Sequence, residues 1–260
     1  LQAAGIRTGM YTSPHLVDYP ERFLVNGEAI PPVAFAAAID YVRGLAAAMT
    51  AGGGEQPTEF EVLTAAAFHH FAVAGAEWAV VEAGLGGLLD STNVVLPEAA
   101  VITNVALEHT DRCGNTVAEI ARHKAGIIKA GRPVVTAARG AALDVIRSEA
   151  QAKDAPLYVS GRDFAAEAAG REGWWQTVAV RVRERGEFGR FSLPLLGRHQ
   201  VENAAVAVMT ALVLAEREPR LSSAAIREGL AATRWPGRFE VVPGWPPVVL
   251  DGAHNPAGAE

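Results

Sequence analysis

The sequence predicts an α/β fold in which a mostly parallel sheet is flanked by helices. Strand patterns alternate with helical patterns from Thr8 to about Ser160, as is typical of parallel sheets covered by helices on both faces. The runs Trp78–Val81 and Ala99–Val105 are mainly apolar, which favours parallel strands that are fully buried. These two observations together predict the fold class.

The other elements follow from local patterns. Leu1–Ala4 resembles the end of a helix, and Thr8–Tyr11 the strand that follows it. Thr58 begins a segment with helical periodicity that continues to about Phe71, and we expect this helix to be the longest of the chain. The glycine-rich segment Ala47–Gln56 is expected to be a loop.

The second half of the chain changes pattern. Apolar and polar residues alternate between Trp174 and Leu195, with Arg185 and Gly186 at a turn, which predicts a β-hairpin. A helix is expected from Gln200 to about Ala215. The Pro-rich segment Trp235–Pro247 then favours a domain boundary, so that residues 1–234 form one domain and residues 235–260 a linker and the start of another.

Composition favours a soluble cytoplasmic enzyme. The chain has 260 residues, half of them hydrophobic, enough for one large domain and part of another. Its net charge of −6 argues against a nucleic-acid partner. The single cysteine, Cys113, excludes an intramolecular disulfide and fits a reducing compartment. No uninterrupted apolar run approaches the length of a membrane span, and we expect a monomer without a membrane partner.

The segment Glu82–Asn93 is the most informative part of the chain. It follows the apolar run Trp78–Val81 and places an acidic side chain and several glycines at the end of a strand, where open α/β sheets bind ligands. Its glycines do not fit the dinucleotide motif G-x-G-x-x-G, because Leu89 occupies the third position. We expect a backbone that passes close to another group, although a purely structural glycine turn fits the local pattern equally well.

Lys124 occupies an unusual position on a helix. The capping box Thr116–Glu119 predicts that this helix begins at Thr116. One face of it then contains Lys124 among apolar residues, namely Val117, Ile120, Ala121, Ile127 and Ile128. Either the lysine stem covers apolar surface while its ammonium group reaches water, or the amine is held in a functional site beside the cations Arg122 and His123.

Nine short segments carry a family pattern over nearly the whole chain. In order they are TSPHL (Thr12–Leu16), ERFLVNG (Glu21–Gly27), TEFE (Thr58–Glu61), EAGLGGLLDSTN (Glu82–Asn93), ITNVALEHT (Ile102–Thr110), HKAGIIK (His123–Lys129), LGRHQVENAAVA (Leu196–Ala207), WPGRFE (Trp235–Glu240) and DGAHNP (Asp251–Pro256). These segments, in this order, resemble folylpolyglutamate synthase/dihydrofolate synthase of the Mur ligase superfamily.

The resemblance implies a Mur-ligase-type central ATPase domain over residues 1–234 and the start of a smaller α/β C-terminal domain at residues 235–260. It also implies a phosphate loop upstream of Leu1, since these 260 residues contain no G-x-x-x-x-G-K-[ST] match. We therefore expect the chain to be an internal part of a longer ligase. Residues 1–260 alone are expected to bind ATP weakly and to ligate nothing.

The implied reaction joins L-glutamate to dihydropteroate or to a reduced folate. A carboxylate is a poor electrophile, so ATP first converts it to an acyl phosphate, which the amine of glutamate attacks. Such phosphoryl transfer depends on positioning and on divalent cations. By resemblance, Ser13 and Glu82 bind one Mg²⁺ and His109 binds a second, where an imidazole ligand also suits Mn²⁺.

By resemblance Lys124 is carbamylated by CO₂ and offers an anionic oxygen to the second metal. His109 precedes it by 15 residues, a spacing of one loop and two helical turns that allows both side chains to face one cleft. Lys124, Glu82 and His109 are thus the expected catalytic residues.

Further residues are expected to hold the substrates. On the pterin side these are Thr58, Glu59, Phe60, Glu61, Leu89, Asp90 and Ser91. An aromatic ring there can stack on a pterin and acids can pair with its nitrogens, but Thr58 and Glu61 also form a capping box with a purely structural role.

The expected ATP-binding residues are Asn203, Arg238, Asp251 and His254. Each of the first three has a structural alternative. Asn203 fits a surface helix residue, Arg238 a salt bridge in a linker, and Asp251 a helix N-cap.

Departures from the family pattern concern the substrate more than the reaction. Bacterial relatives usually carry a basic residue at Leu88, commonly aspartate at Glu108 and commonly glutamate at His123. The alternatives within enzymes are a folylpolyglutamate synthase without the second activity or a muramyl-peptide ligase relative. A non-catalytic folate-binding descendant is the alternative from another class of protein.

Overall fold

The computed structural model describes residues 1–108 and 110–253. The chain consists of two compact units. The first comprises Leu1–Leu96 and Leu107–Ile127, and the second comprises Pro97–Ala106 and the residues from Ile128 onward. The predicted boundary near residue 235 falls inside the second unit and stays a prediction.

The first unit contains a four-stranded sheet with the order β3-β2-β1-β4. β1 and β4 are parallel, with Tyr11 opposite Val81, whereas β2 and β3 are antiparallel additions on the other side of β1. The strand predictions for β1 and β4 are confirmed with their bounds. The prediction that Trp78–Val81 is fully buried is wrong, because Val80 is 48% exposed. The strands are β1 (Thr8–Tyr11), β2 (Phe23–Val25), β3 (Glu28–Ala29) and β4 (Trp78–Val81), and the short 3₁₀ helices of this unit are Gln2–Ala4, Tyr19–Arg22 and Ser91–Val94.

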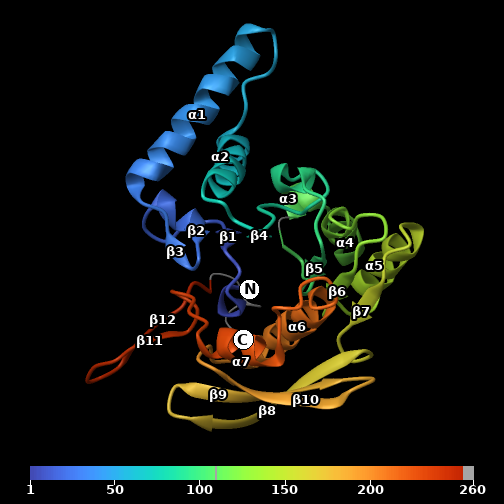
Figure 1. Ribbon diagram of the computed structural model, residues 1–260. Coiled ribbons are helices and arrows are strands. Elements are labelled where there is room, and N and C mark those ends of the chain that lie inside the picture. Colours follow the sequence, from blue (N-terminus) through green and yellow to red (C-terminus); the bar gives the residue numbers. More distant parts are fainter. Residues whose placement is uncertain (109, 254–260) are drawn as a thin grey trace. The chain divides into compact units, whose positions relative to one another are not determined.

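Two long helices, α1 (Pro32–Ala51) and α2 (Glu59–Val73), lie side by side in this unit (Figure 1). Their inner faces join the β-sheet in one core, which is built from Tyr11, Phe23, Ile30, Ala38, Val42, Leu63, Ala66, Ala67 and Phe71. The prediction that α2 is the longest helix is wrong, because α1 has 20 residues and α2 has 15. α1 also extends into the segment predicted as a loop. Its alanine-rich sequence favours helix through propensity but gives little apolar periodicity to detect.

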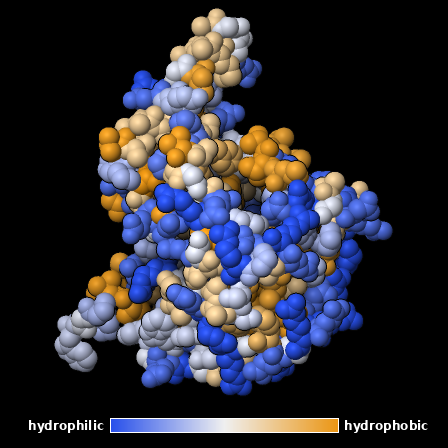
Figure 2. Space-filling model, in the orientation of Figure 1, coloured by the Kyte–Doolittle hydropathy of each residue, from blue (hydrophilic) through white to orange (hydrophobic). Residues whose placement is uncertain are grey.

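α1 carries much exposed apolar surface. Val33, Tyr41, Leu45 and Met49 are exposed, and Figure 2 shows apolar surface over the α1–α2 hairpin. By length and composition alone the helix meets the criterion for a membrane span, with a mean hydropathy of 1.3. It nevertheless packs on α2 and carries Asp40, paired with Arg43 at 3.1 Å, and charges near the centre of a span are costly. The expected absence of a membrane partner stays a prediction.

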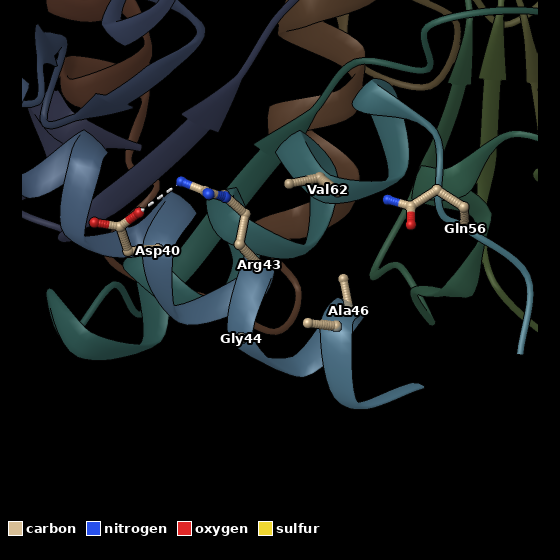
Figure 3. A pocket seen from close by; sticks show the side chains of 7 residues that line it. Asp40, Arg43, Gly44, Ala46, Gln56 and Val62 are labelled. Carbon is tan, nitrogen blue, oxygen red and sulfur yellow. Dashed lines mark hydrogen bonds and ion pairs between the residues drawn. The ribbon is translucent and has the colours of Figure 1, made fainter. Parts of the chain in front are cut away.

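A cavity of about 480 Å³ opens between α1 and the start of α2 (Figure 3). Asp40, Arg43, Gln56 and Val62 are among the residues that line it. None of the predicted site residues lines this cavity, so it is separate from the candidate site described below.

The first unit also contains α3 (Thr110–Cys113) and α4 (Val117–Ala125). Thr116 caps α4, and its hydroxyl accepts from the Glu119 N–H while the Glu119 carboxylate accepts from the Thr116 N–H. The predicted helix start is confirmed. The predicted apolar face is confirmed for Ile120 and Ala121, which are buried, but the helix ends at Ala125, before Ile127 and Ile128.

The second unit begins with a three-stranded sheet of order β5-β6-β7, in which both pairs are parallel. Its elements are β5 (Ala100–Ile102), β6 (Val134–Thr136), α5 (Gly140–Ala152) and β7 (Leu157–Val159). The prediction that the first strand is fully buried is wrong, because Val101 is 37% exposed. β5 is an edge strand of this sheet, and the face that carries Val101 is left uncovered.

An antiparallel meander follows. Its strands are β8 (Phe164–Glu172), β9 (Trp175–Val182) and β10 (Gly186–Leu193). The predicted hairpin is β9–β10, whereas β8 was not predicted, because it is rich in alanine and shows little alternation of apolar and polar residues. α6 (Arg198–Leu214) and α7 (Ser223–Ala231) pack against the meander (Figure 1). α6 confirms the predicted helix, and its apolar residues share one core with the meander and β6.

A two-stranded antiparallel hairpin, β11 (Glu240–Val242) and β12 (Val248–Leu250), ends the described chain. The prediction of a strand at Val248–Leu250 is confirmed. The preceding Pro-rich segment, predicted as a linker, contributes β11. The α/β fold class is confirmed by these elements.

Candidate active site

The ends of β1 and β4 bring Glu82 and Ser13 together. Because the two strands are parallel and in register, the residues that follow them leave the sheet at the same edge. The Glu82 N–H donates to the Tyr11 carbonyl oxygen at 2.9 Å, and the Ser13 N–H donates to Glu82 Oε2 at 2.9 Å. The carboxylate is therefore fixed beside the Ser13 backbone, and the role of the two residues as ligands of one metal stays a prediction.

The glycines after Glu82 make close backbone contacts on two sides. Gly84 lies against the Phe60 ring at the start of α2, so close that an added Cβ would be 2.4 Å from the ring tip. Gly86 and Gly87 both have positive φ and lie against α4, where a Cβ on Gly87 would be 2.9 Å from the His123 carbonyl oxygen. The prediction of a backbone that passes close to other groups is confirmed, and those groups are elements of the protein itself.

Lys124 is held near the same turn. The Leu88 N–H donates to the His123 carbonyl oxygen at 2.8 Å, which ties the turn to the end of α4. The Lys124 ammonium pairs with Glu108 Oε1 at 3.1 Å, and the side chains are 25% and 40% exposed respectively. The lysine is therefore neither buried in the apolar face nor free in water. It lies in an ion pair at the end of α4.

The two acids at the start of α2 have different partners. Glu61 accepts from the Thr58 N–H and hydroxyl, at 2.7 and 2.8 Å, and these bonds lower the pKa of its carboxyl group. The capping-box interpretation of Thr58 and Glu61 is thus confirmed. The Glu59 carboxylate takes no part in the capping box and accepts from the Tyr19 hydroxyl at 2.9 Å. This hydrogen bond raises the pKa of the Tyr19 phenol.

Tyr19 belongs to a cluster that sequence reasoning missed. Its ring lies 4.4 Å from the His15 ring, and the Arg22 guanidinium lies over it at 5.3 Å. Arg22 Nε donates to His15 Nδ1 at 2.9 Å. The signal was present in the segments TSPHL and ERFLVNG, which carry His15 and Arg22.

Asp90 shapes the far end of the glycine-rich turn. Its carboxylate accepts from the Leu85 N–H at 2.8 Å and from the Thr92 N–H at 3.0 Å. Oδ1 also accepts from the Thr92 hydroxyl, so lone-pair capacity for a substrate donor is left on Oδ2, which accepts the Leu85 N–H. Leu89 beside it is 85% exposed and Ser91 is half-buried, so the three predicted residues lie together, though with unequal exposure.

The predicted ATP-binding residues that the structure describes lie in the second unit. Asp251 accepts from the Phe239 and Ala253 N–H groups, both at 2.7 Å, and these bonds, helped by nearby Arg238 and His199, lower the pKa of its carboxyl group. Asp251 thus organises a turn near Arg238.

Asn203 lies on α6, where its amide donates to Gln200 Oε1 at 3.2 Å. It is one helical turn after His199, which sequence reasoning missed although both stand in the segment LGRHQVENAAVA. The predicted site residues His109 and His254 lie outside the residues that the structure describes.

The two metal sites implied by the sequence differ in their donor atoms. Within residues 1–108 and 110–253 no group of three or more His, Cys, Asp or Glu side chains is placed to hold a metal ion. At the predicted first site the Glu82 carboxylate accepts from the Ser13 backbone N–H, and carboxylate and hydroxyl oxygens are hard donors of the kind that Mg²⁺ prefers. At the second site the charged ammonium of Lys124 is no ligand, but Glu108 adds a carboxylate beside it.

The family model of the Mur ligase middle domain matches residues 36–211. The chain therefore belongs to the Mur ligase family. Among curated relatives, this Mur ligase chain is 41% identical to the dihydrofolate synthase/folylpolyglutamate synthase of Bacillus subtilis (strain 168) over 268 residues, which cover 100% of this chain and 61% of the relative. It is 38% identical to the folylpolyglutamate synthase of Lacticaseibacillus casei, over 99% of this chain and 61% of the relative.

A solved structure described as the FPGS-AMPPCP-folate complex superposes on this Mur ligase chain with a TM-score of 0.93 and 38% sequence identity. The match covers 99% of this chain and 63% of that one. The chain thus spans about three fifths of the length of these relatives.

Proposed function

We propose that the protein is an ATP-dependent carboxylate–amine ligase that adds L-glutamate to dihydropteroate, to reduced folates or to both. In this reaction ATP phosphorylates the substrate carboxylate, ADP leaves, and the glutamate amine displaces phosphate from the acyl phosphate. The names of the relatives, folylpolyglutamate and dihydrofolate synthases, support the substrate class. ATP as co-substrate is supported by the structural relative with AMPPCP and folate.

The observation that carries the proposal is the glycine-rich turn of the first unit. Within nine residues it begins at Glu82, contacts the aromatic Phe60 through Gly84, contacts the end of α4 through Gly87, and ends at Asp90. One rigid segment therefore links a carboxylate suited to Mg²⁺ with residues suited to a flat heterocycle. A phosphoryl-transfer enzyme needs such fixed positioning more than it needs covalent chemistry.

The residues divide into three roles. Glu82 and Ser13 would hold one Mg²⁺, and Lys124, with the predicted His109, would serve a second, where Mn²⁺ is also suited. These ions would neutralise charge on the phosphates. Phe60, Glu59 and Asp90 face the pterin, with Leu89 and Ser91 beside them. Asn203, Arg238 and Asp251 serve ATP in the second unit, where His254 is also predicted.

Lys124 takes its role through carbamylation. The ammonium group first loses a proton, and the neutral amine then attacks CO₂. A C–N bond forms and a second proton is released, so that a cation becomes an anionic oxygen donor. Glu108 now pairs with the ammonium group at 3.1 Å, so this pair opens when the carbamate forms. Aspartate, common at this position in bacterial relatives, would hold its charge one methylene further from the lysine.

Leu88 supports a difference in substrate preference. It is half exposed and its side chain packs on Gly126, so no cation stands at this point of the turn to meet a carboxylate. We propose a cytoplasmic, monomeric enzyme whose preference among folates differs from that of relatives with a basic residue here.

The proposal is tested with the purified full-length protein, ATP, Mg²⁺ and L-glutamate. Offered dihydropteroate or tetrahydrofolate, it is expected to release ADP and phosphate and to form a glutamylated product detectable by mass spectrometry. Turnover of tetrahydrofolate alone would leave a folylpolyglutamate synthase without the second activity. Turnover of a UDP-muramyl peptide instead, or binding of folates without ADP release, would refute the proposal.

A further inference from the structure

Gly84 must be glycine because of a neighbouring ring, not because of its own backbone. Its φ lies outside the positive range that favours glycine. The three heavy atoms nearest to an added Cβ all belong to Phe60, with Cζ at 2.4 Å and the two Cε atoms at 2.9 Å. These distances are far inside van der Waals contact, so a side chain at position 84 fits only if the ring moves.

A second residue contacts the same ring from another side. The Tyr11 and Phe60 rings are stacked, with centroids 5.9 Å apart and planes inclined by 30°. Tyr11 is fully buried and meets Phe23 edge-on at 5.6 Å. Its hydroxyl lies 3.3 Å from Thr64 Oγ1, and the Thr64 hydroxyl donates to the Phe60 carbonyl oxygen at 2.7 Å. Tyr11 is therefore a rigid wall behind Phe60.

We propose that Gly84 and Tyr11 are positioning residues that together seat the Phe60 ring for stacking on the flat ring of the substrate. The inference rests on the proposed function, in which Phe60 stacks on a pterin. Phe60 is only half-buried, so part of the ring is left for a ligand. Gly84 follows Glu82 by two residues, and the seat therefore fixes the ring relative to the end of β4.

A purely structural role for this contact makes a different prediction. If Phe60 only fills space at the start of α2, Gly84→Ala lowers stability and leaves the KM for every substrate unchanged. If the contact positions the ring, the KM for the pterin substrate rises while the KM for ATP stays the same. Aromatic stacking lost through a displaced ring corresponds to a change on the order of tenfold.

The experiment uses the full-length protein with Gly84→Ala, Tyr11→Leu and Tyr11→Phe. We expect the first two to raise the KM for dihydropteroate or tetrahydrofolate about tenfold, with a smaller change in kcat. Tyr11→Phe keeps the ring and is expected to retain a KM close to that of the parent. Gly44→Ala is the control, because an added Cβ there meets nothing within 4 Å.

A double-mutant cycle with Phe60→Leu decides whether Gly84 acts through the ring. The shorter side chain leaves room for a Cβ, so Gly84→Ala is expected to change neither the pterin KM nor the melting temperature further in that background. If Gly84→Ala and Phe60→Leu change the melting temperature additively, Gly84 does not hold the Phe60 ring in place. If the two substitutions are coupled in melting temperature but Gly84→Ala leaves the pterin KM unchanged, the contact is structural and Gly84 is not a positioning residue. A protein that turns over no pterin overturns the proposed function and the substrate role with it, whereas the melting cycle still decides whether the seat exists.

Discussion

Lys124→Ala separates the stability of the protein from its activity. The substitution removes the ion pair with Glu108, whose side chains are 25% and 40% exposed. Partly exposed pairs of this kind contribute about 1 kcal/mol or less, so the melting temperature is expected to fall only slightly. In the proposed ligase the same change removes a group that serves the transferred phosphate, which commonly costs on the order of 10²-fold or more in rate, about 2.7 kcal/mol.

The assay compares ADP release at saturating ATP and Mg²⁺ with thermal unfolding followed by circular dichroism. Lys153→Ala is a matched control, because its pair with Glu149 at 2.7 Å has similar exposures of 30% and 38% and it also donates to the Ile128 carbonyl oxygen. The control is expected to lose at least as much stability as Lys124→Ala and to keep its activity. Lys124→Glu is expected to restore part of the rate by supplying an oxygen. Full activity in Lys124→Ala would refute the role assigned to this lysine.

Three further substitutions test other parts of the structure. Glu82→Gln keeps the shape of the side chain but removes its charge, so the rate of acyl-phosphate formation is expected to fall on the order of 10²-fold or more. Glu77→Gln is the control, because the Glu77 carboxylate accepts the Arg7 N–H at the opposite end of the same strands. Equal rates for the two variants would contradict the role assigned to Glu82. Thr58→Ala removes the N-cap of α2 and is expected to cost about 1 kcal/mol in chemical denaturation, which an unchanged midpoint would disprove. Glu119 has a lowered pKa because it accepts from the Thr116 hydroxyl and from two backbone N–H groups, so its contribution is present above the ordinary glutamate pKa and is lost as the pH falls through the lower folded value. Glu119→Gln should therefore flatten the acid side of the stability profile, and a profile identical to that of the parent would argue against it.

Much of the local structure could be predicted from the sequence. The strands β1 and β4 and the starts of α2 and α4 depend on apolar runs and capping boxes, whose causes lie within a few residues of each other. Prediction failed in segments where apolar and polar positions differ little. Both α1 and β8 are rich in alanine, so neither shows the periodicity on which prediction depends.

The sequence by itself determined the family pattern and the residue types of the site, because a carboxylate at a strand end and a glycine-rich turn are local features. Only the tertiary structure decided what those residues contact. That Gly84 faces Phe60, that Tyr19 donates to Glu59 and that Lys124 pairs with Glu108 are contacts between elements 16 to 40 residues apart in the chain. Such contacts are set by how strands and helices pack around a common core, and no pattern of neighbouring residues encodes that packing.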